Sequence, residues 1–169
     1  MTSGLATTDT SAEELDRVLS ATAARAADFA ELLPVERAVL LEQLADVLDG
    51  AAEELVPLAV RESRLTEVRL TGELARTTGQ LRFFGQVLRD GAWLDAVIDT
   101  ADPEAPALRP DVRSASTAIG VALVFAASNF PFAFSVAGGV TAAALAAGCP
   151  VVLRAHPGHP VLAGGVGEL

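Results

Sequence analysis

The 169-residue sequence has one cysteine, no tyrosine and no lysine, and the shortages of cysteine and of basic residues each exclude a class of protein. A single cysteine cannot form an internal disulfide, and no Cys/His group has the spacing of a structural zinc site. All twelve basic residues are arginines, and they face 22 acidic residues, which gives a net charge of −10. Because phosphate backbones are bound by clustered basic residues, we expect no nucleic-acid partner.

We also expect no export signal, because residues 1–14 contain no basic segment and already carry three acidic side chains. Residues 114–153 carry no charge at all, and a membrane span needs about 20 continuous apolar residues. Turn-forming residues interrupt this run at Ser128-Asn129, Pro131, Gly138-Gly139 and Pro150. We therefore expect a cytoplasmic protein, and a small membrane protein is the weakest alternative.

The N-terminal half of the chain carries the apolar periodicity of helices, with one apolar stripe on each helix. Ser11 and Glu14 have the spacing of a capping box, which starts a helix by satisfying free N–H groups. Gly50 is expected to end the second helix in the left-handed conformation. Four helices are predicted. The first starts at Ser11, the second runs from Pro34 to Gly50, the third spans residues 51–63, and the fourth runs from a cap at Thr71 to Gly91.

Beyond Trp93 the pattern changes to an extended connector, because three prolines fall within residues 99–110. The apolar run 120–125 predicts a strand of a parallel sheet that is buried on both faces. Residues 132–147 predict an alanine-rich helix, and 151–153 predict a second buried strand. Strand, helix and strand in this order form a βαβ unit, which favours a right-handed parallel crossover and an α/β fold.

Few side chains of this unit could carry chemistry. Cys149 lies in a turn of small residues and is expected to be buried and inert. His156 and His159 are too few for a metal site, which needs three or four ligands, so we expect no metal. Together with Arg154, these histidines could instead face an anionic ligand at the carboxyl edge of the sheet.

Asn129 follows the first strand of the unit, and its spacing leaves two interpretations open. It could form a turn or cap a helix, or its amide could point into a site and stabilise an oxyanion. Gly138 and Gly139 fall inside the predicted helix at a cost of roughly 1–2 kcal/mol, which close approach to the sheet or a ligand would explain. The sequence has no G-x-G-x-x-G or P-loop pattern.

Three segments carry a resemblance to a known family: Leu70–Trp93, Val124–Gly139 with its N-F-P-x-A-x-S-x-A-G-G run, and Ala146–Pro157. Over about residues 11–160 the sequence resembles the aldehyde dehydrogenase superfamily. More narrowly, it is similar to the NADP-preferring branch that includes 2,5-dioxovalerate (α-ketoglutarate semialdehyde) and fatty aldehyde dehydrogenases.

The resemblance implies N-terminal helices followed by the first βαβ of a Rossmann-like dinucleotide-binding domain. It divides the chain into a helical part of that domain (1–93), an extended connector and strand (94–118) and a truncated strand-helix-strand (119–169). The family also has a small oligomerisation arm, so the parent enzyme is expected to be a homo-oligomer that acts on an aldehyde substrate.

Individual site residues follow from the same resemblance. In the family, the Asn of the N-F-P motif donates to the oxyanion of a thiohemiacetal, which implies that role for Asn129. Ala127, Ser128 and Phe130, which flank it, are expected to contact the cofactor.

The residues after the second strand bear on the choice of cofactor. Arg154 stands where the family usually has a Lys that contacts the adenosine ribose, which implies the same contact for Arg154, with His156 beside it. Pro157 replaces the Glu that binds both ribose hydroxyls in NAD-preferring relatives, so no carboxylate would repel a 2′-phosphate. The resemblance therefore favours NADP, with NAD as the alternative cofactor.

The sequence also departs from the family. The family's catalytic Cys and general-base Glu lie downstream, in segments that these residues do not contain, and Cys149 matches only a structural position. Val140 stands where this branch typically has Asp, and the sequence after Pro160 lacks a strong helix start.

We therefore expect the N-terminal portion of an NADP-dependent aldehyde dehydrogenase, which would not turn over alone. The parent reaction is attack of a thiolate on the aldehyde, hydride transfer to NADP and hydrolysis of the thioester. The alternative is a non-catalytic remnant or docking module that needs an intact partner.

Overall fold

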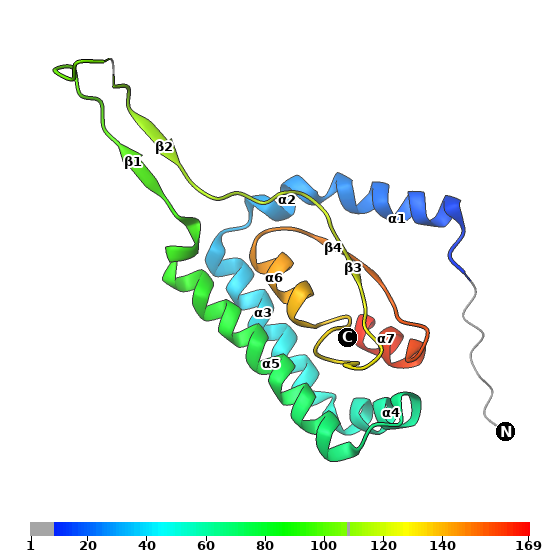
Figure 1. Ribbon diagram of the computed structural model, residues 1–169. Coiled ribbons are helices and arrows are strands. Elements are labelled where there is room, and N and C mark those ends of the chain that lie inside the picture. The colour runs from blue at the N-terminus through cyan, green and yellow to red at the C-terminus, as the bar shows by residue number, and fades with distance from the viewer. Residues whose placement is uncertain (1–8, 108) are drawn as a thin grey trace.

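A computed structural model describes residues 9–107 and 109–169 and combines a helical body, a two-stranded parallel sheet and a projecting hairpin (Figure 1). This arrangement confirms the mixed α/β class. In chain order the elements are α1 (Ala12–Ala24), α2 (Ala26–Glu31), α3 (Pro34–Gly50), α4 (Ala52–Ser63), α5 (Glu67–Asp90), η1 (Ala92–Leu94), β1 (Val97–Asp99), β2 (Val112–Ser114), β3 (Ala122–Phe125), α6 (Gly139–Ala146), β4 (Val151–Arg154) and α7 (Pro160–Gly167).

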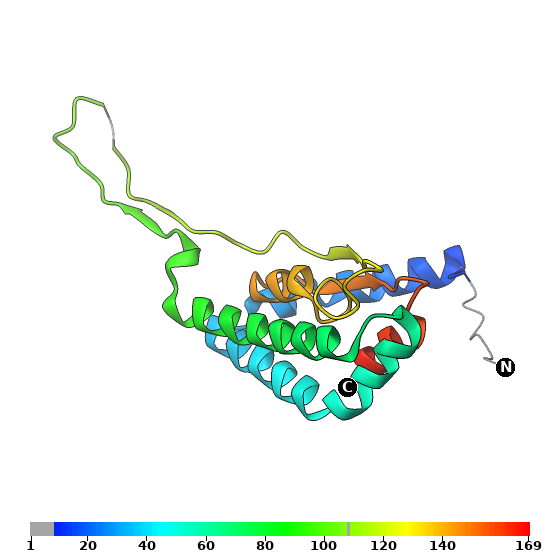
Figure 2. The ribbon, with the colours of Figure 1, turned by 60° about the horizontal axis from the view of Figure 1, so that its bottom comes forward.

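The core is centred on α3 and α5, which lie side by side and run in opposite directions (Figures 1 and 2). Leucines recur one or two helical turns apart and give each helix one apolar face. Leu41, Leu70 and Leu81 are fully buried, and burying a side chain of this size contributes about 1.5–3 kcal/mol. Smaller core contributions come from Ala38, Ala45, Leu48, Leu74 and Leu88.

Two predicted helix ends are confirmed. The Ser11 hydroxyl accepts a hydrogen bond from the Glu14 N–H at 3.1 Å and caps α1. The Glu14 carboxylate does not return to complete the capping box, because it binds the Arg17 guanidinium at 2.8 Å. Gly91 has a φ of 80° and ends α5 in the left-handed conformation.

Two other details of the predicted helix ends are wrong. Gly50 is the last residue of α3, as predicted, but it is not left-handed, because Ala51 donates its N–H to the Val47 carbonyl and continues the right-handed path. Thr71 does not cap α5, which begins at Glu67 behind an extended Thr66. An acidic residue in the first helical turn is favourable there, so α5 starts one turn earlier than the threonine indicated.

Arg37 joins the start of α3 to the end of α6. Its side chain is buried, with Nε donating to the Ala146 carbonyl at 3.1 Å and Nη1 donating to the Leu32 carbonyl at 2.6 Å. Burial lowers the pKa of the Arg37 guanidinium. The guanidinium also lies over the Trp93 ring, 5.7 Å from its centroid, so a single charged side chain connects three parts of the core.

The predicted strand-helix-strand unit is present, and β3 and β4 pair in parallel from Ala122 opposite Val151 to Phe125 opposite Arg154. Figure 2 shows α6 between these strands and the α3–α5 pair. The prediction that both faces of the strands are buried is wrong for both strands. In β3 Val124 is buried, whereas Leu123 and Phe125 are 51% and 64% exposed, because the helices cover only one face. In β4 the predicted residues 151–153 are only half-buried.

The predicted helix 132–147 is also shorter than expected, because α6 begins only at Gly139. Residues 131–138 form successive turns, and the Gly139 N–H donates to the Ala133 carbonyl at 2.9 Å. Gly138 is therefore the N-cap of α6 rather than an interior residue. In the described ranges 9–107 and 109–169, no helix is both long and apolar enough to span a bilayer.

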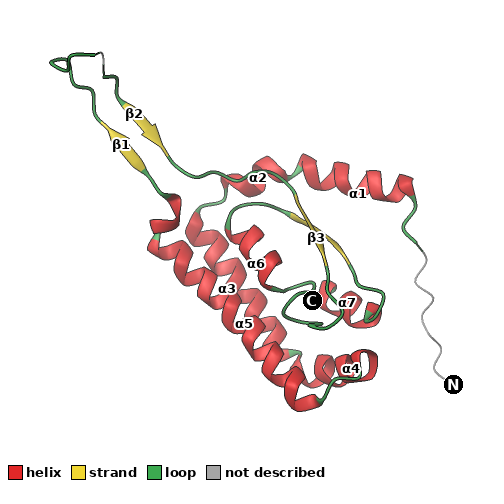
Figure 3. Ribbon diagram, in the orientation of Figure 1, coloured by secondary structure: helices red, strands yellow, loops and turns green. Residues whose placement is uncertain are grey.

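The proline-rich connector is part of an antiparallel hairpin, in which Val97 pairs with Ser114 and Asp99 with Val112. Figure 3 shows β1 and β2 projecting away from the helices. An extended conformation was expected here, but the pairing of the two arms was not. Apolar side chains of both strands are exposed on the hairpin: Val97, Ile98 and Val112.

The helix α7 forms although its own sequence has no strong start signal. Its cap comes from α4, where the Glu62 carboxylate accepts the N–H groups of Val161 and Leu162 at 3.1 and 2.8 Å. A carboxylate at a helix N-terminus satisfies free donors and complements the helix dipole. Leu162 is fully buried by this docking.

Candidate functional site

The carboxyl ends of β3 and β4 bring together the two segments that the sequence singled out. Residues 127–130 follow β3 and residues 154–157 end or follow β4. The Ala126 N–H donates to the Arg154 carbonyl at 3.1 Å and extends the parallel ladder to this edge. In open α/β sheets, ligands bind at this edge, so the structure places all seven predicted site residues around one candidate site.

Asn129 lies at the tip of the turn after β3 and is exposed. Its backbone carbonyl accepts a hydrogen bond from Arg69 Nη2 at 2.7 Å, whereas its side-chain amide bonds to none of the described residues. Since Gly138 is the N-cap of α6, the helix-capping interpretation of Asn129 is wrong. The amide N–H₂ remains available to donate to a ligand.

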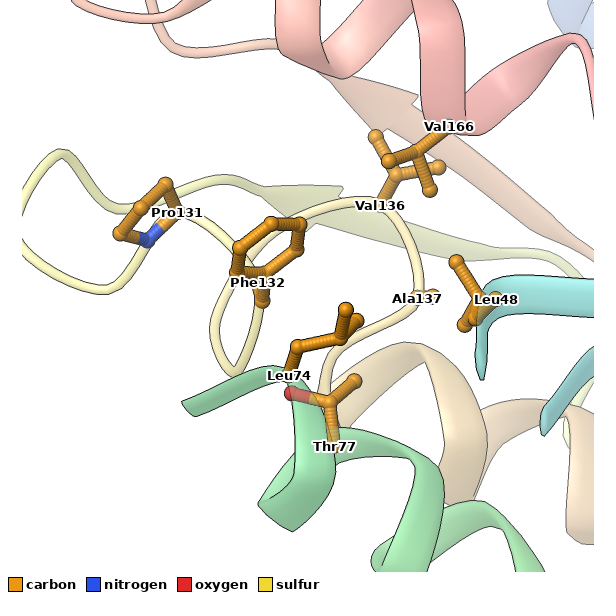
Figure 4. A pocket seen from close by; sticks show the side chains of 8 residues that line it. All are labelled: Leu48, Leu74, Thr77, Pro131, Phe132, Val136, Ala137 and Val166. Atoms are coloured by element: carbon orange, nitrogen blue, oxygen red, sulfur yellow. The ribbon is translucent and has the colours of Figure 1, made fainter. Parts of the chain in front are cut away.

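A buried carboxylate holds the turns that follow Asn129. Glu73 of α5 is only 6% exposed, and its Oε1 accepts the N–H groups of Phe132 and Ala133 at 2.8 and 3.0 Å. Figure 4 shows the Phe132 ring near Leu74 within an apolar cluster, which leaves no room for a water molecule. The turn with the N-F-P motif is thereby anchored to the longest helix.

Sequence reasoning missed Glu73, although a signal was present. Leu70, Leu74 and Thr77 define the buried stripe of α5, and Glu73 falls within it at the i+3 position from Leu70. A charged residue on a buried helix face needs a partner from elsewhere in the chain. The partner here is a pair of backbone N–H groups about sixty residues away.

His159 does not face a ligand, which corrects one of the predictions. Its ring is fully buried, and Nε2 lies 2.9 Å from the Ala127 carbonyl oxygen. The ring stacks against His156 with centroids 5.7 Å apart. His159 therefore holds the turn after β3 from the interior of the protein and does not contribute to a binding surface.

The other residues after β4 remain accessible. Arg154 and Pro157 are exposed and His156 is half-buried. The His156 Nδ1 accepts the Gly158 N–H at 2.9 Å, which places the ring proton of a neutral imidazole on Nε2. Within the part of the chain that the structure describes, no carboxylate lies within ion-pair distance of Arg154.

Cys149 is buried at the turn between α6 and β4, as predicted. Among residues 9–107 and 109–169, no three His, Cys, Asp or Glu side chains group closely enough to hold a metal ion. The accessible polar groups of the site therefore include the Asn129 amide, the Ser128 hydroxyl, the Arg154 guanidinium and the His156 imidazole. Such groups bind and polarise an anionic or oxyanionic ligand.

The fold alone indicates the class of protein. The structure aligns with an aldehyde dehydrogenase from Brucella melitensis biovar abortus 2308 with a TM-score of 0.80, at 21% identity, covering 95% of this chain and 31% of that one. A lactaldehyde dehydrogenase from Escherichia coli gives the same TM-score at 23% identity, covering 95% of this chain and 32% of that one. The chain has the fold of the corresponding part of aldehyde dehydrogenases.

The sequence then identifies the family. Residues 4–169 match the Aldehyde dehydrogenase family, and the chain belongs to it. It is 51% identical over 124 residues to α-ketoglutaric semialdehyde dehydrogenase 2 of Azospirillum brasilense, covering 73% of this chain and 24% of that one. It is 44% identical over 148 residues to α-ketoglutaric semialdehyde dehydrogenase of Acinetobacter baylyi, covering 87% of this chain and 28% of that one. The chain thus spans about a quarter of the length of these curated relatives.

Proposed function

We propose that this chain is the N-terminal part of the cofactor-binding region of an NADP-dependent aldehyde dehydrogenase that oxidises 2,5-dioxovalerate. The observation that supports the proposal is the exposed, unengaged amide of Asn129, which follows β3 at the carboxyl edge of the parallel strands where Arg154 ends β4. In this proposal residues 1–93 form the helical part, 94–118 the connector and 119–169 the first strand-helix-strand of a Rossmann-like domain.

The role of Asn129 is to stabilise charge. When a thiolate from the remainder of the enzyme attacks the aldehyde carbon, the carbonyl oxygen becomes an oxyanion, and the Asn129 amide donates a hydrogen bond to it. Loss of one such donor typically lowers the rate about 10²–10³-fold. Because Arg69 holds the Asn129 carbonyl and Glu73 holds the turn that follows it, the donor is positioned before the substrate binds.

The residues after β4 fit the adenosine end of NADP. None of the described acidic residues lies within ion-pair distance of Arg154, and positions 155–159 contain no carboxylate. Arg154 and His156 would hold the 2′-phosphate, Pro157 would leave room for it, and the turn Ala127–Phe130 would flank the cofactor. When bound, NADP supplies the hydride acceptor of the reaction.

An adenosine probe tests this assignment on the chain itself. We expect 2′,5′-ADP to bind roughly tenfold more tightly than 5′-AMP, since the 2′-phosphate adds a charge-assisted contact worth about 1.4 kcal/mol. Arg154→Gln should abolish that difference, measured by isothermal titration calorimetry. Arg113→Gln on the remote hairpin is the matched control and should preserve it. If the Arg154 variant still prefers 2′,5′-ADP over 5′-AMP as strongly as the native chain does, the NADP assignment is contradicted.

The activity is tested on the protein in its native host. Antibodies against α1 should capture a polypeptide that contains these peptides, whose intact mass and 2,5-dioxovalerate-dependent reduction of NADP are then measured. We expect a species much heavier than 17.4 kDa with this activity. A heavier species that reduces NADP with no aldehyde would overturn the proposal.

A second candidate, a non-catalytic module that docks on an intact relative, is favoured by exposed apolar side chains on β3, namely Leu123 and Phe125. A native species near 17.4 kDa that co-purifies with a full-length relative would support it. We also propose a cytoplasmic homo-oligomer in which the β1–β2 hairpin is the oligomerisation arm, consistent with exposed Val97, Ile98 and Val112.

A further inference from the structure

Two arginines of α5 lie on the aromatic rings of the turn that carries Asn129. The Arg69 guanidinium carbon is 5.0 Å from the centroid of the Phe130 ring, and that of Arg76 is 5.9 Å from the Phe134 ring. The two rings meet edge to face with centroids 5.2 Å apart. Positions seven apart lie two turns apart on one helix face, about 10 Å along the axis.

The charges of these two arginines are not neutralised by acidic side chains. Further along α5, Arg82 pairs with Asp46 and Asp49, and Arg89 pairs with Glu42. By contrast, no acidic side chain among residues 9–107 and 109–169 lies within 4.0 Å of the Arg69 or Arg76 guanidinium.

The acidic residue nearest to both in sequence is Glu73, at i+4 from Arg69 and i−3 from Arg76. Those are the positions from which a helix normally forms ion pairs. The Glu73 carboxylate is instead buried against the Phe132 and Ala133 N–H groups. In a chain with a net charge of −10, two unpaired guanidinium groups therefore remain beside the candidate site.

We propose that Arg69 and Arg76, resting on Phe130 and Phe134, form a subsite for the carboxylate end of the substrate. This inference rests on the proposed function, and it assigns the substrate class as short aldehydes that carry a carboxylate at the far end. Guanidinium groups bind carboxylates through paired N–H donors. Stacking on an aromatic face orients the guanidinium plane without using its N–H groups.

Arg69 also connects this subsite to the reacting end. One of its N–H groups donates to the Asn129 carbonyl at 2.7 Å, and the remaining donors are free to meet a carboxylate. A bound carboxylate therefore orders the same side chain that holds the Asn129 backbone. Uncharged aldehydes lack this contact, so the subsite discriminates by charge.

The test is a titration of the ¹⁵N-labelled chain with glutarate, and with glutaramide as the uncharged analogue, followed by NMR. We expect glutarate to shift the Arg69 and Arg76 Nε–H signals, and glutaramide to bind at least tenfold more weakly. Arg69→Gln and Arg76→Gln should each weaken glutarate binding about fivefold. Arg82→Gln removes a charge from the same helix and should leave the affinity for glutarate within twofold of that of the native chain.

Each other outcome has a definite meaning. If Arg82→Gln weakens binding as much as Arg76→Gln, the attraction is general and the subsite proposal is wrong. If glutarate does not bind but 2′,5′-ADP does, the subsite fails while the cofactor assignment stands. If glutarate binds at these arginines and 2′,5′-ADP does not, the cofactor assignment fails instead. Unchanged binding of 2′,5′-ADP in the two variants shows that they remain folded.

Discussion

Replacing Gly138 with alanine is expected to lower the free energy of unfolding by about 3 kcal/mol. A Cβ at this position would lie 2.5 Å from the Ala133 carbonyl oxygen and 2.9 Å from the Phe134 nitrogen. Both are backbone atoms of the turns that Glu73 anchors, so neither can move without breaking hydrogen bonds. The backbone of Gly138, with φ −71° and ψ 177°, is one that alanine adopts readily, so the cost is steric.

Gly79 provides the matched control. It lies inside α5, where an added Cβ meets nothing within 4 Å. Gly79→Ala should therefore raise the free energy of unfolding by about 0.5–1 kcal/mol, because alanine loses less backbone entropy in a helix. Urea denaturation followed by circular dichroism measures both variants. A Gly138→Ala protein as stable as the native chain would show that the turns before α6 are able to relax.

The same segment shows why the sequence predicted α6 too long. Phe132, Phe134 and Val136 are apolar like the residues that follow, and apolar periodicity alone does not separate a buried helix from tightly packed turns. What stops the helix is a long-range contact, the Glu73 carboxylate that takes the Phe132 and Ala133 N–H groups. The glycine pair was the local signal, but the close approach at Gly138 is to the backbone of Ala133 and Phe134 in the preceding turns, not to the sheet or a ligand as expected.

The candidate site was predictable where it depends on topology. Asn129 and Arg154 each follow or end a strand, and parallel pairing alone brings such residues to one edge. The partners of the supporting residues were not predictable, because Glu73, His159 and Glu62 act on segments far from them in sequence. Each is a polar group whose partner is a backbone atom, and a sequence pattern does not record backbone partners.

One face of α5 thus controls the turn with the N-F-P motif through three charged side chains. Arg69 holds the Asn129 carbonyl, Glu73 holds the next turn, and Arg76 lies over the Phe134 ring. The two arginines are exposed, whereas Glu73 is buried. Stability therefore depends mainly on Glu73, and ligand selection mainly on the arginines.

Glu73→Leu should accordingly lower the free energy of unfolding by about 3 kcal/mol, because two buried N–H groups lose their acceptor. The loss is partly offset, since leucine also removes Oε2, a buried oxygen that has no hydrogen-bond partner among the described residues. Glu73→Gln is the matched control. Its amide oxygen accepts both N–H groups and leaves only an unpaired NH₂ at the Oε2 position, so we expect a cost of about 1 kcal/mol.

Hydrogen exchange separates this local role from general destabilisation. In Glu73→Leu the Phe132 and Ala133 amides should exchange about a hundredfold faster than in the native chain, as a loss of about 3 kcal/mol implies. In Glu73→Gln the exchange rates of these two amides should stay within tenfold of the native rates. Helical amides of α3, far from the turn, should lose protection only to the extent that global stability falls. Native protection at Phe132 and Ala133 in the leucine variant would contradict the anchoring role, because it would mean that the turn closes without the carboxylate.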